Sequence, residues 1–155
     1  MDELGAIKYL LSAGYPKALE YFIEWLKQGH KYDRYAHRFF VSDDFSNFFN
    51  PDSIKDIVEL IELSSKKELV TDDYFDPIRT TYELLKTFYG KASAKDFEGL
   101  IEELTYCRER LAKDGKAEMY HVNAILRETR NAYHKEKSKP MEFKEIAQRM
   151  NGFML

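Results

Sequence analysis

Apolar residues recur along most of this chain at steps of three and four, which is the spacing of one face of an α-helix. The pattern is clearest in two sets of residues: Ile54, Ile57, Val58 and Ile61, and Phe97, Leu100, Ile101, Leu104 and Leu111. No comparable stretch alternates apolar and polar residues as a half-buried strand would. The pattern therefore predicts an all-α protein.

Proline and glycine divide the chain into segments of helical length. Proline suits the first turn of a helix, where its missing N–H would be unpaired anyway, and glycine accepts the left-handed backbone just past the last turn. Three segments begin with proline and end with glycine, namely 16–29, 77–90 and 140–152. Ser93 and Asp96 have the spacing of a capping box that would open a long helix.

The apolar period and the positions of proline and glycine together predict about seven helices with short connections. The expected ranges are 3–12, 16–28, 32–49, 51–65, 74–89, 94–114 and 117–137, followed by a short helix near 141–150. Residues 66–76 form the longest predicted loop. A chain of 155 residues is long enough to bury a hydrophobic core without disulfides or metals. We therefore predict one all-helical domain over residues 1–155, a single-domain helical bundle.

Aromatic residues are concentrated in the first third of the chain. Residues 1–50 contain twelve of the 23 Phe, Tyr and Trp residues. These side chains either fill a bulky core or form an exposed apolar surface that binds a partner. The candidates for such a surface are Phe39, Phe40, Phe45, Phe48 and Phe49.

The charge pattern limits the possible partners. The net charge is −3, made up of −1 over residues 1–50, −4 over 51–100 and +2 over 101–155, which argues against a nucleic-acid binder by bulk charge but leaves room for a local basic face. Cys107 is the only cysteine, so it cannot form an intrachain disulfide, and we expect it in the core. The chain opens with acidic residues and has no apolar run of about 20 residues, so we predict a cytoplasmic protein without a membrane partner.

Most catalytic motifs have no counterpart in this sequence. It contains neither a Gly-rich phosphate loop nor a Gly-x-Ser-x-Gly elbow. Two carboxylate and histidine pairs have helical spacing, Asp33 with His37 and Glu118 with His121, but a di-metal bundle needs more ligands of this kind. We predict no metal and no cofactor.

The segment 119–134 has the strongest chemical pattern. Its apolar stripe is Met119, Val122, Leu126 and Tyr133, and its polar stripe is Asn123, Arg127, Arg130 and His134. At about 100° per residue the polar stripe covers an arc of roughly 60°, centred about 100° from the apolar one. We expect it at the margin of the core, accessible and partly shielded.

The spacing of Arg127 and His134, with six residues between them, resembles the Arg-x4-6-His signature of the HEPN superfamily of helical ribonucleases and nucleotide-binding domains. The resemblance implies a helical dimer that cleaves RNA without metal. His134 would act as general acid or base and Arg127 would stabilise charge on the phosphate. The family often has Asn, Asp or His directly after the arginine, where this chain has Glu128.

Two functions follow from these observations. The first is a non-enzymatic interaction protein, an adaptor, inhibitor or small subunit, that binds another protein through its aromatic N-terminal half. The alternative is a HEPN-like ribonuclease or RNA-binding homodimer that uses Arg127 and His134, with Asn123 and Arg130 as further binding residues.

Overall fold

The computed structural model describes residues 2–39, 48, 50–72 and 74–154, with the side chains of 39, 140–145, 149 and 151–154 excepted. Its helices are α1 (Glu3–Ser12), α2 (Ala18–Lys27), α3 (Arg34–Phe39), the 3-10 turn η2 (Pro51–Ser53), α4 (Ile54–Ser65), α5 (Ile78–Lys91), α6 (Ala94–Lys113) and α7 (Tyr120–Met154). The described residues form no β-strand beyond two isolated bridges, Tyr32 with Thr71 and Asp72 with Phe75. The predicted all-α bundle is confirmed.

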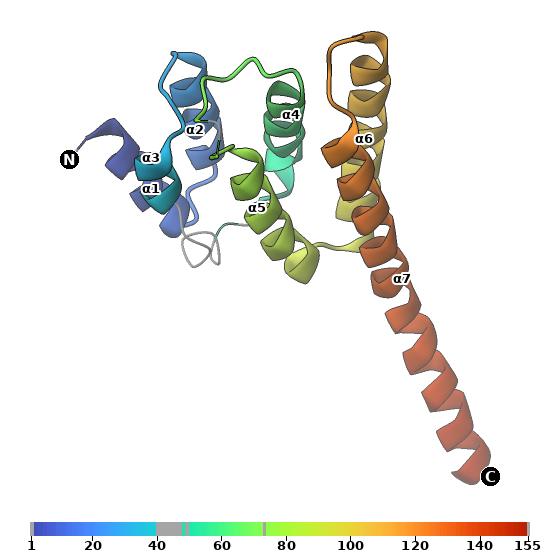
Figure 1. Cartoon of the computed structure of the whole chain (residues 1–155). Coiled ribbons are helices and arrows are strands. Elements are labelled where there is room, and N and C mark those ends of the chain that lie inside the picture. The colour runs from blue at the N-terminus through green and yellow to red at the C-terminus, as the bar shows by residue number, and fades with distance from the viewer. Residues whose placement is uncertain (1, 40–47, 49, 73, 155) are drawn as a thin grey trace.

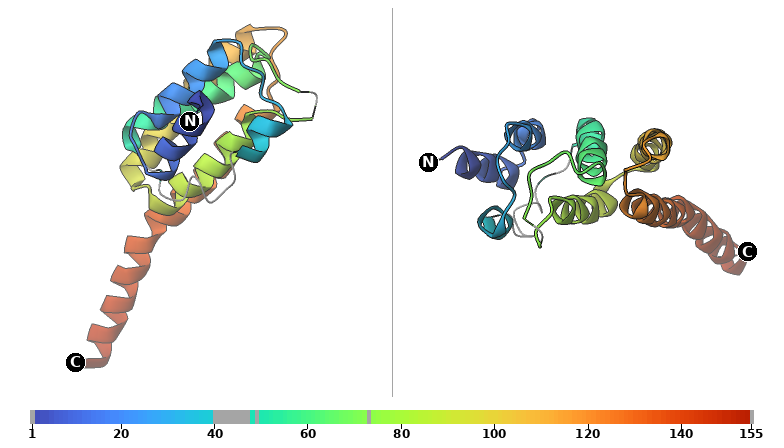
Figure 2. Two further views of the ribbon diagram at one scale, coloured as in Figure 1. Left: turned by 90° about the vertical axis from the view of Figure 1, so that its left-hand side faces the viewer. Right: turned by 45° about the horizontal axis from the view of Figure 1, so that its top comes forward.

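The helices form two layers, as Figures 1 and 2 show from three directions. Helices α2, α4 and α6 lie side by side in one layer, with contacts between α2 and α4 and between α4 and α6. Helices α3, α5 and α7 form the other layer. Helix α1 packs against α2, while α6 and α7 form an antiparallel pair at the opposite end of the molecule.

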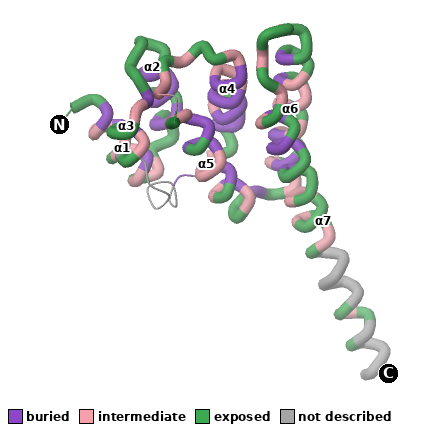
Figure 3. The backbone as a smooth tube through the Cα atoms, viewed as in Figure 1, coloured by how far each residue is buried: buried purple, intermediate pink, exposed green. Residues whose placement is uncertain are grey.

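Helix α4 is the centre of this arrangement. It contacts α2, α5, α6 and α7, so its apolar residues must point in several directions rather than along one stripe. Seven of its twelve residues are buried, and buried and partly buried segments alternate along the tube of α4 in Figure 3. The buried set is Ile54, Ile57, Val58, Leu60, Ile61, Ser64 and Ser65.

Tyrosine hydroxyls connect elements that are distant in the sequence. Tyr32, which is fully buried, places its Oη 2.8 Å from Oγ1 of Thr80 in α5. In α5, the Oη of Tyr89 lies 2.7 Å from Oγ1 of Thr129 in α7, and burial raises the pKa of Tyr89 to about 12. Each pair satisfies polar atoms that would otherwise be costly to bury.

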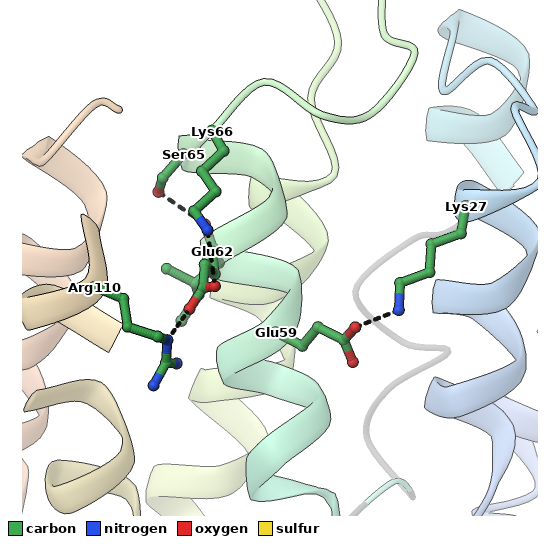
Figure 4. A network of polar contacts seen from close by, with 7 residues as sticks. Lys27, Glu59, Glu62, Ser65, Lys66 and Arg110 are labelled. Carbon is green, nitrogen blue, oxygen red and sulfur yellow. Dashed lines mark hydrogen bonds and ion pairs between the residues drawn. The ribbon is translucent and has the colours of Figure 1, made fainter. Parts of the chain in front are cut away.

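Ionic contacts join α4 to the helices on either side of it in its layer (Figure 4). Glu59 pairs with Lys27 of α2. Glu62 accepts a hydrogen bond of 2.6 Å from Nε of Arg110 in α6 and lies 3.3 Å from Nζ of Lys66. Burial would raise the pKa of Glu62, but the hydrogen bonds from Arg110 and Lys66 outweigh it and lower the pKa below its ordinary value of 4.5.

Most helix boundaries agree with the sequence pattern. The range 3–12 is α1, and 94–114 is α6, whose capping box is present because Ser93 Oγ accepts from the N–H of Asp96 and the Asp96 carboxylate accepts from the N–H of Ser93. The predicted loop 66–76 lies between α4 and α5. Gly29 follows α2 with a φ of +88°, as a helix-ending glycine should.

Two predictions about helix ends are wrong. The predicted helix 32–49 is α3, which covers Arg34–Phe39, and Phe48 is not helical. No break separates 117–137 from a short helix near 141–150, because α7 runs from Tyr120 to Met154. Pro140 lies within α7 instead of opening a new helix; its fixed φ is compatible with the helix, although an interior proline is unfavourable there. Gly90 and Gly152 likewise lie inside helices.

In the described part of the chain, no helix is long and apolar enough to cross a membrane. The long helix α7 instead carries charged residues on most of its turns. Its 35 residues extend over about 52 Å, well beyond the roughly 30 Å of the 20-residue α6, so its C-terminal part projects away from the other helices in Figure 1.

The Glu62 contacts predict a pH-dependent contribution to stability. A carboxyl whose pKa is lowered by folding stabilises the folded state above its unfolded pKa, and this contribution is lost as the pH falls through the folded pKa. We expect Glu62→Gln to lower the free energy of unfolding by about 1 kcal/mol at pH 7, since Arg110 is half exposed, and the difference from wild type to shrink below pH 4.5.

Urea denaturation at both pH values measures this difference. Glu109→Gln is the matched control, because Glu109 is an exposed carboxylate of the neighbouring α6 that forms no ion pair with a described residue. A deficit in Glu62→Gln that is the same at both pH values would contradict the electrostatic origin.

Candidate functional site

The two stripes predicted on 119–134 lie on α7 and the turn before it. Of the apolar stripe, Val122 and Leu126 are buried, and Met119 and Tyr133 pack against the core partly buried. The buried face also includes Ile125 and Thr129, which the sequence analysis did not single out.

The polar stripe lies on the open side of α7. Asn123, Arg127, Arg130 and His134 are all exposed, so the accessible part of the expectation agrees with the structure. Helix α7 packs its buried face against α6 and α4. No described residue forms a hydrogen bond or ion pair with the side chain of Asn123, Arg127 or Arg130, and the His134 ring lies 5.7 Å from the ring of Tyr133. We call these four residues, with Lys137 one turn further on, the basic stripe.

Helix α6 carries a stripe of the opposite charge beside the basic stripe. Its exposed carboxylates are Glu98, Glu102 and Glu109, and we call them the acidic stripe. The Oη of Tyr133 donates to Oε1 of Glu98 at 2.7 Å, which sets the register of the two antiparallel helices. Since residues 98 and 133 are level, residue 130 is level with about 101, and 127 with about 104. The two stripes therefore run along the same end face of the molecule, over the same height.

The structure describes the side chain of only one of the five N-terminal phenylalanines. Phe48 is in the core, with 3% of its surface exposed. The side chain of Phe39 and the residues Phe40, Phe45 and Phe49 lie outside the described part of the structure.

Among the described residues of the N-terminal part, the exposed aromatic side chains are tyrosines. Tyr9, Tyr15, Tyr21 and Tyr35 are all exposed, and the rings of Tyr15 and Tyr21 stack at 6.2 Å. Tyrosine has an apolar ring and a polar hydroxyl, so it tolerates water in the free protein and still contributes a large contact area when a partner covers it. This combination is typical of protein-binding surfaces.

One of these tyrosines belongs to a groove between α1, α2 and α3, which we call the N-terminal groove. It has a volume of about 380 Å³ and is lined by Asp2, Glu3, Leu4, Trp25, His30, Lys31, Asp33, Tyr35 and Ala36. The His30 ring lies parallel to the Trp25 ring at 4.7 Å, so the two form a flat stacked wall. Tyr35 is 60% exposed beside it.

Two carboxylates of the N-terminal groove have structural partners. Oδ1 of Asp2 accepts from the N–H of Gly5 at 2.7 Å and caps α1, and Oδ1 of Asp33 accepts from the N–H of Ala36 at 3.0 Å at the start of α3. The positive end of each helix offsets part of these charges. The groove therefore offers an aromatic wall with weakly acidic edges.

A larger groove of about 590 Å³ lies between α5 and α7. Its lining is mostly charged and amide side chains, Lys86, Glu128, Asn131, Lys135, Glu136 and Lys139, with Tyr89, Gly90 and Ala132. The Tyr89 hydroxyl is already bonded to Thr129. This groove has no exposed aromatic anchor.

The two carboxylate and histidine pairs serve the fold. Asp33 caps α3, while the His37 ring packs 5.1 Å from that of Phe75, and burial, reinforced by Arg79, lowers the pKa of His37. Nδ1 of His121 lies 3.0 Å from Oη of Tyr82, and its Nε2 lies 3.8 Å from Glu118. Among the described residues, no group of three or more His, Cys, Asp or Glu is arranged to hold a metal ion.

The N-terminal groove could not be predicted from the sequence, because the residues that line it come from three helices. The number of tyrosines among the N-terminal aromatic residues could have indicated an exposed aromatic surface, since tyrosine is the aromatic residue that most readily stays on a surface. The stack of Trp25 on His30 has no sequence signature, because it depends on the turn at Gly29.

No family model, curated protein or solved structure matches this chain. The HEPN resemblance consequently depends on the spacing of Arg127 and His134 alone.

The position of Cys107 gives a direct test of the core. Its side chain is fully buried, and desolvation, with Glu62 nearby, raises the pKa of its thiol to about 12. Because the thiolate is the reactive form, we expect the folded protein to resist a thiol-labelling reagent at pH 8 and to react at once in denaturant. Asn131→Cys is the control, since this exposed position should label rapidly in the folded protein. Equal rates for Cys107 and the introduced thiol would contradict the buried position.

Proposed function

We propose that this protein is a non-enzymatic helical interaction module that binds a segment of another protein in the N-terminal groove. The observation that carries the proposal is the exposed Tyr35 beside the stacked Trp25 and His30. Rigid aromatic side chains contribute much contact area for little loss of conformational entropy, and they dominate the binding energy of many interfaces.

The lining of the groove favours a particular partner chemistry. Leu4, Ala36 and the Trp25 edge favour apolar side chains at the centre of the segment. Glu3 is exposed at the rim and caps nothing, whereas Asp2 and Asp33 are occupied as helix caps. A segment with one or two large apolar residues flanked by Lys or Arg fits this lining better than an acidic one.

The proposal is tested by selecting peptides from a displayed random library on the immobilised protein. We expect the recovered peptides to be apolar with flanking basic residues. Tyr35→Ala should weaken their binding about tenfold, which corresponds to the loss of one interfacial hot spot of about 1.4 kcal/mol. Isothermal titration of the selected peptides measures the change.

Tyr74→Ala is the matched control, because Tyr74 is 82% exposed and lies outside the groove. It should bind the selected peptides as wild type does. Peptides that bind wild type, Tyr35→Ala and Tyr74→Ala equally well would contradict the proposal.

The second candidate function is the metal-free ribonuclease. It is favoured by the exposure of Arg127 and His134 on one face of α7, about 10 Å apart along the helix axis, where substrate can reach both. The acidic stripe on α6 counts against it, since an RNA backbone laid along the basic stripe would pass close to the carboxylates of Glu98 and Glu102.

This candidate predicts that His134→Ala abolishes cleavage of a mixed RNA pool, because the general acid or base is lost. Cleavage is followed by gel electrophoresis, with folding checked by circular dichroism. Lys139→Ala is the control and should cleave normally, because Lys139 is exposed in the groove between α5 and α7, about 120° around the helix from Arg127. Equal activity of His134→Ala and wild type would exclude the ribonuclease.

A further inference from the structure

We infer that the end face formed by α6 and α7 binds a second copy of this chain. The face carries the acidic stripe on one helix and the basic stripe on the neighbouring helix. The proposal concerns a different surface from the N-terminal groove and does not depend on the function proposed for it.

Between residues 98 and 109 the exposed charges of α6 on this face are acidic, and the exposed Lys95 and Lys113 lie beyond the two ends of this stretch. Glu98, Glu102 and Glu109 project from α6, and Arg127, Arg130 and His134 project from α7. Among the described residues, the only polar contact that these side chains make between α6 and α7 is that of Glu98 with Tyr133. Arg127 and Arg130 form no ion pair with the described carboxylates, so their charges are available to a partner.

A second copy satisfies both stripes at once. In a two-fold dimer the same face meets itself, so each contact occurs twice. If the two-fold axis runs parallel to the helices, α6 of one copy covers α7 of the other, and acidic residues meet basic ones. If the axis runs across the helices, α6 covers α6 and α7 covers α7, and like charges meet. Charge therefore selects the parallel axis.

The register of the α6 and α7 pair then specifies the contacts. A rotation about an axis parallel to the helices keeps every residue at its own height. Residue 130 is level with about 101, so Arg130 of one copy lies opposite Glu102 of the other. Arg127, level with about 104, lies between Glu102 and Tyr106 of the other copy, and the ring of Tyr106 is 47% exposed for such a contact.

The area of the face is sufficient for a specific dimer. Helix α6 has 20 residues and is about 30 Å long, and two adjacent helices are about 20 Å wide. Each copy therefore offers about 600 Å², or about 1,200 Å² in total, which is the lower end of the range for specific interfaces. We expect a reversible dimer that weakens as salt screens the charges.

The dimer is tested by sedimentation velocity at low and high salt, from about 1 to about 200 μM, the range in which interfaces of this size assemble. We expect wild type to dimerise at low salt. Arg127→Glu with Arg130→Glu should be monomeric, and so should Glu102→Lys with Glu109→Lys. Mixed together, the two double variants should form a one-to-one heterodimer. Lys17→Glu with Arg34→Glu, which makes the same change in net charge elsewhere, should dimerise as wild type does.

Disulfide trapping tests which helices meet. A mixture of Glu102→Cys and Arg130→Cys proteins should give a mixed crosslinked dimer, because α6 covers α7. Arg130→Cys alone should not crosslink, whereas a dimer with α7 against α7 would trap it. A monomeric wild type at low salt, a dimer unaffected by both double variants, or crosslinking of Arg130→Cys alone would each overturn the proposal.

Discussion

Burial of α4 against four other helices is the constraint on which the rest of the structure depends. A helix with contacts to α2, α5, α6 and α7 needs apolar residues on most of its circumference, and seven of its twelve residues are buried. Two of its four charged residues, Glu59 and Glu62, lie between α4 and its layer neighbours and pair with Lys27 and Arg110. The central helix therefore fixes both layers, and all of the exposed surfaces with candidate functions lie on the helices at the two ends.

The sequence was most informative where one physical effect acts alone. The apolar period predicted α1, α2, α4 and α6 because each of these helices has a continuous buried face, and the Ser93 and Asp96 capping box formed because it needs only local geometry. Proline was ambiguous. Pro51 opens a helical turn and Pro140 lies inside α7, although both have the same fixed φ. A flanking residue distinguishes Pro51, because the side chain of Asn50 accepts from the N–H of Asp52 and caps the turn.

The candidate sites were harder to predict, because exposure is a property of the assembled helices. Phe48 and Tyr35 both come from the aromatic-rich first third, but one is in the core and the other borders the N-terminal groove. The basic stripe of α7 could be located from the helical period, whereas the extent of its exposure could not. A stripe of residues at the edge of a buried face is shielded only if another helix packs beside it. In the described structure no further helix packs beside α7 at this end.

The two layers end at α6 and α7 for the same reason that this face suits recognition. Another pair of helices would need an apolar surface to cover, and the outer side of α6 and α7 has charged residues instead. Charges of mixed sign would be sufficient to keep this face in water. The signs are separated in the central stretch of this face, where Glu98, Glu102 and Glu109 lie between Lys95 and Lys113 on α6 and basic side chains lie on α7. This separation adds a directional field that repels an identical helix and attracts the opposite one. A face of this kind does not suit the packing of another helix of the same chain. It is complementary to the same face of a second copy.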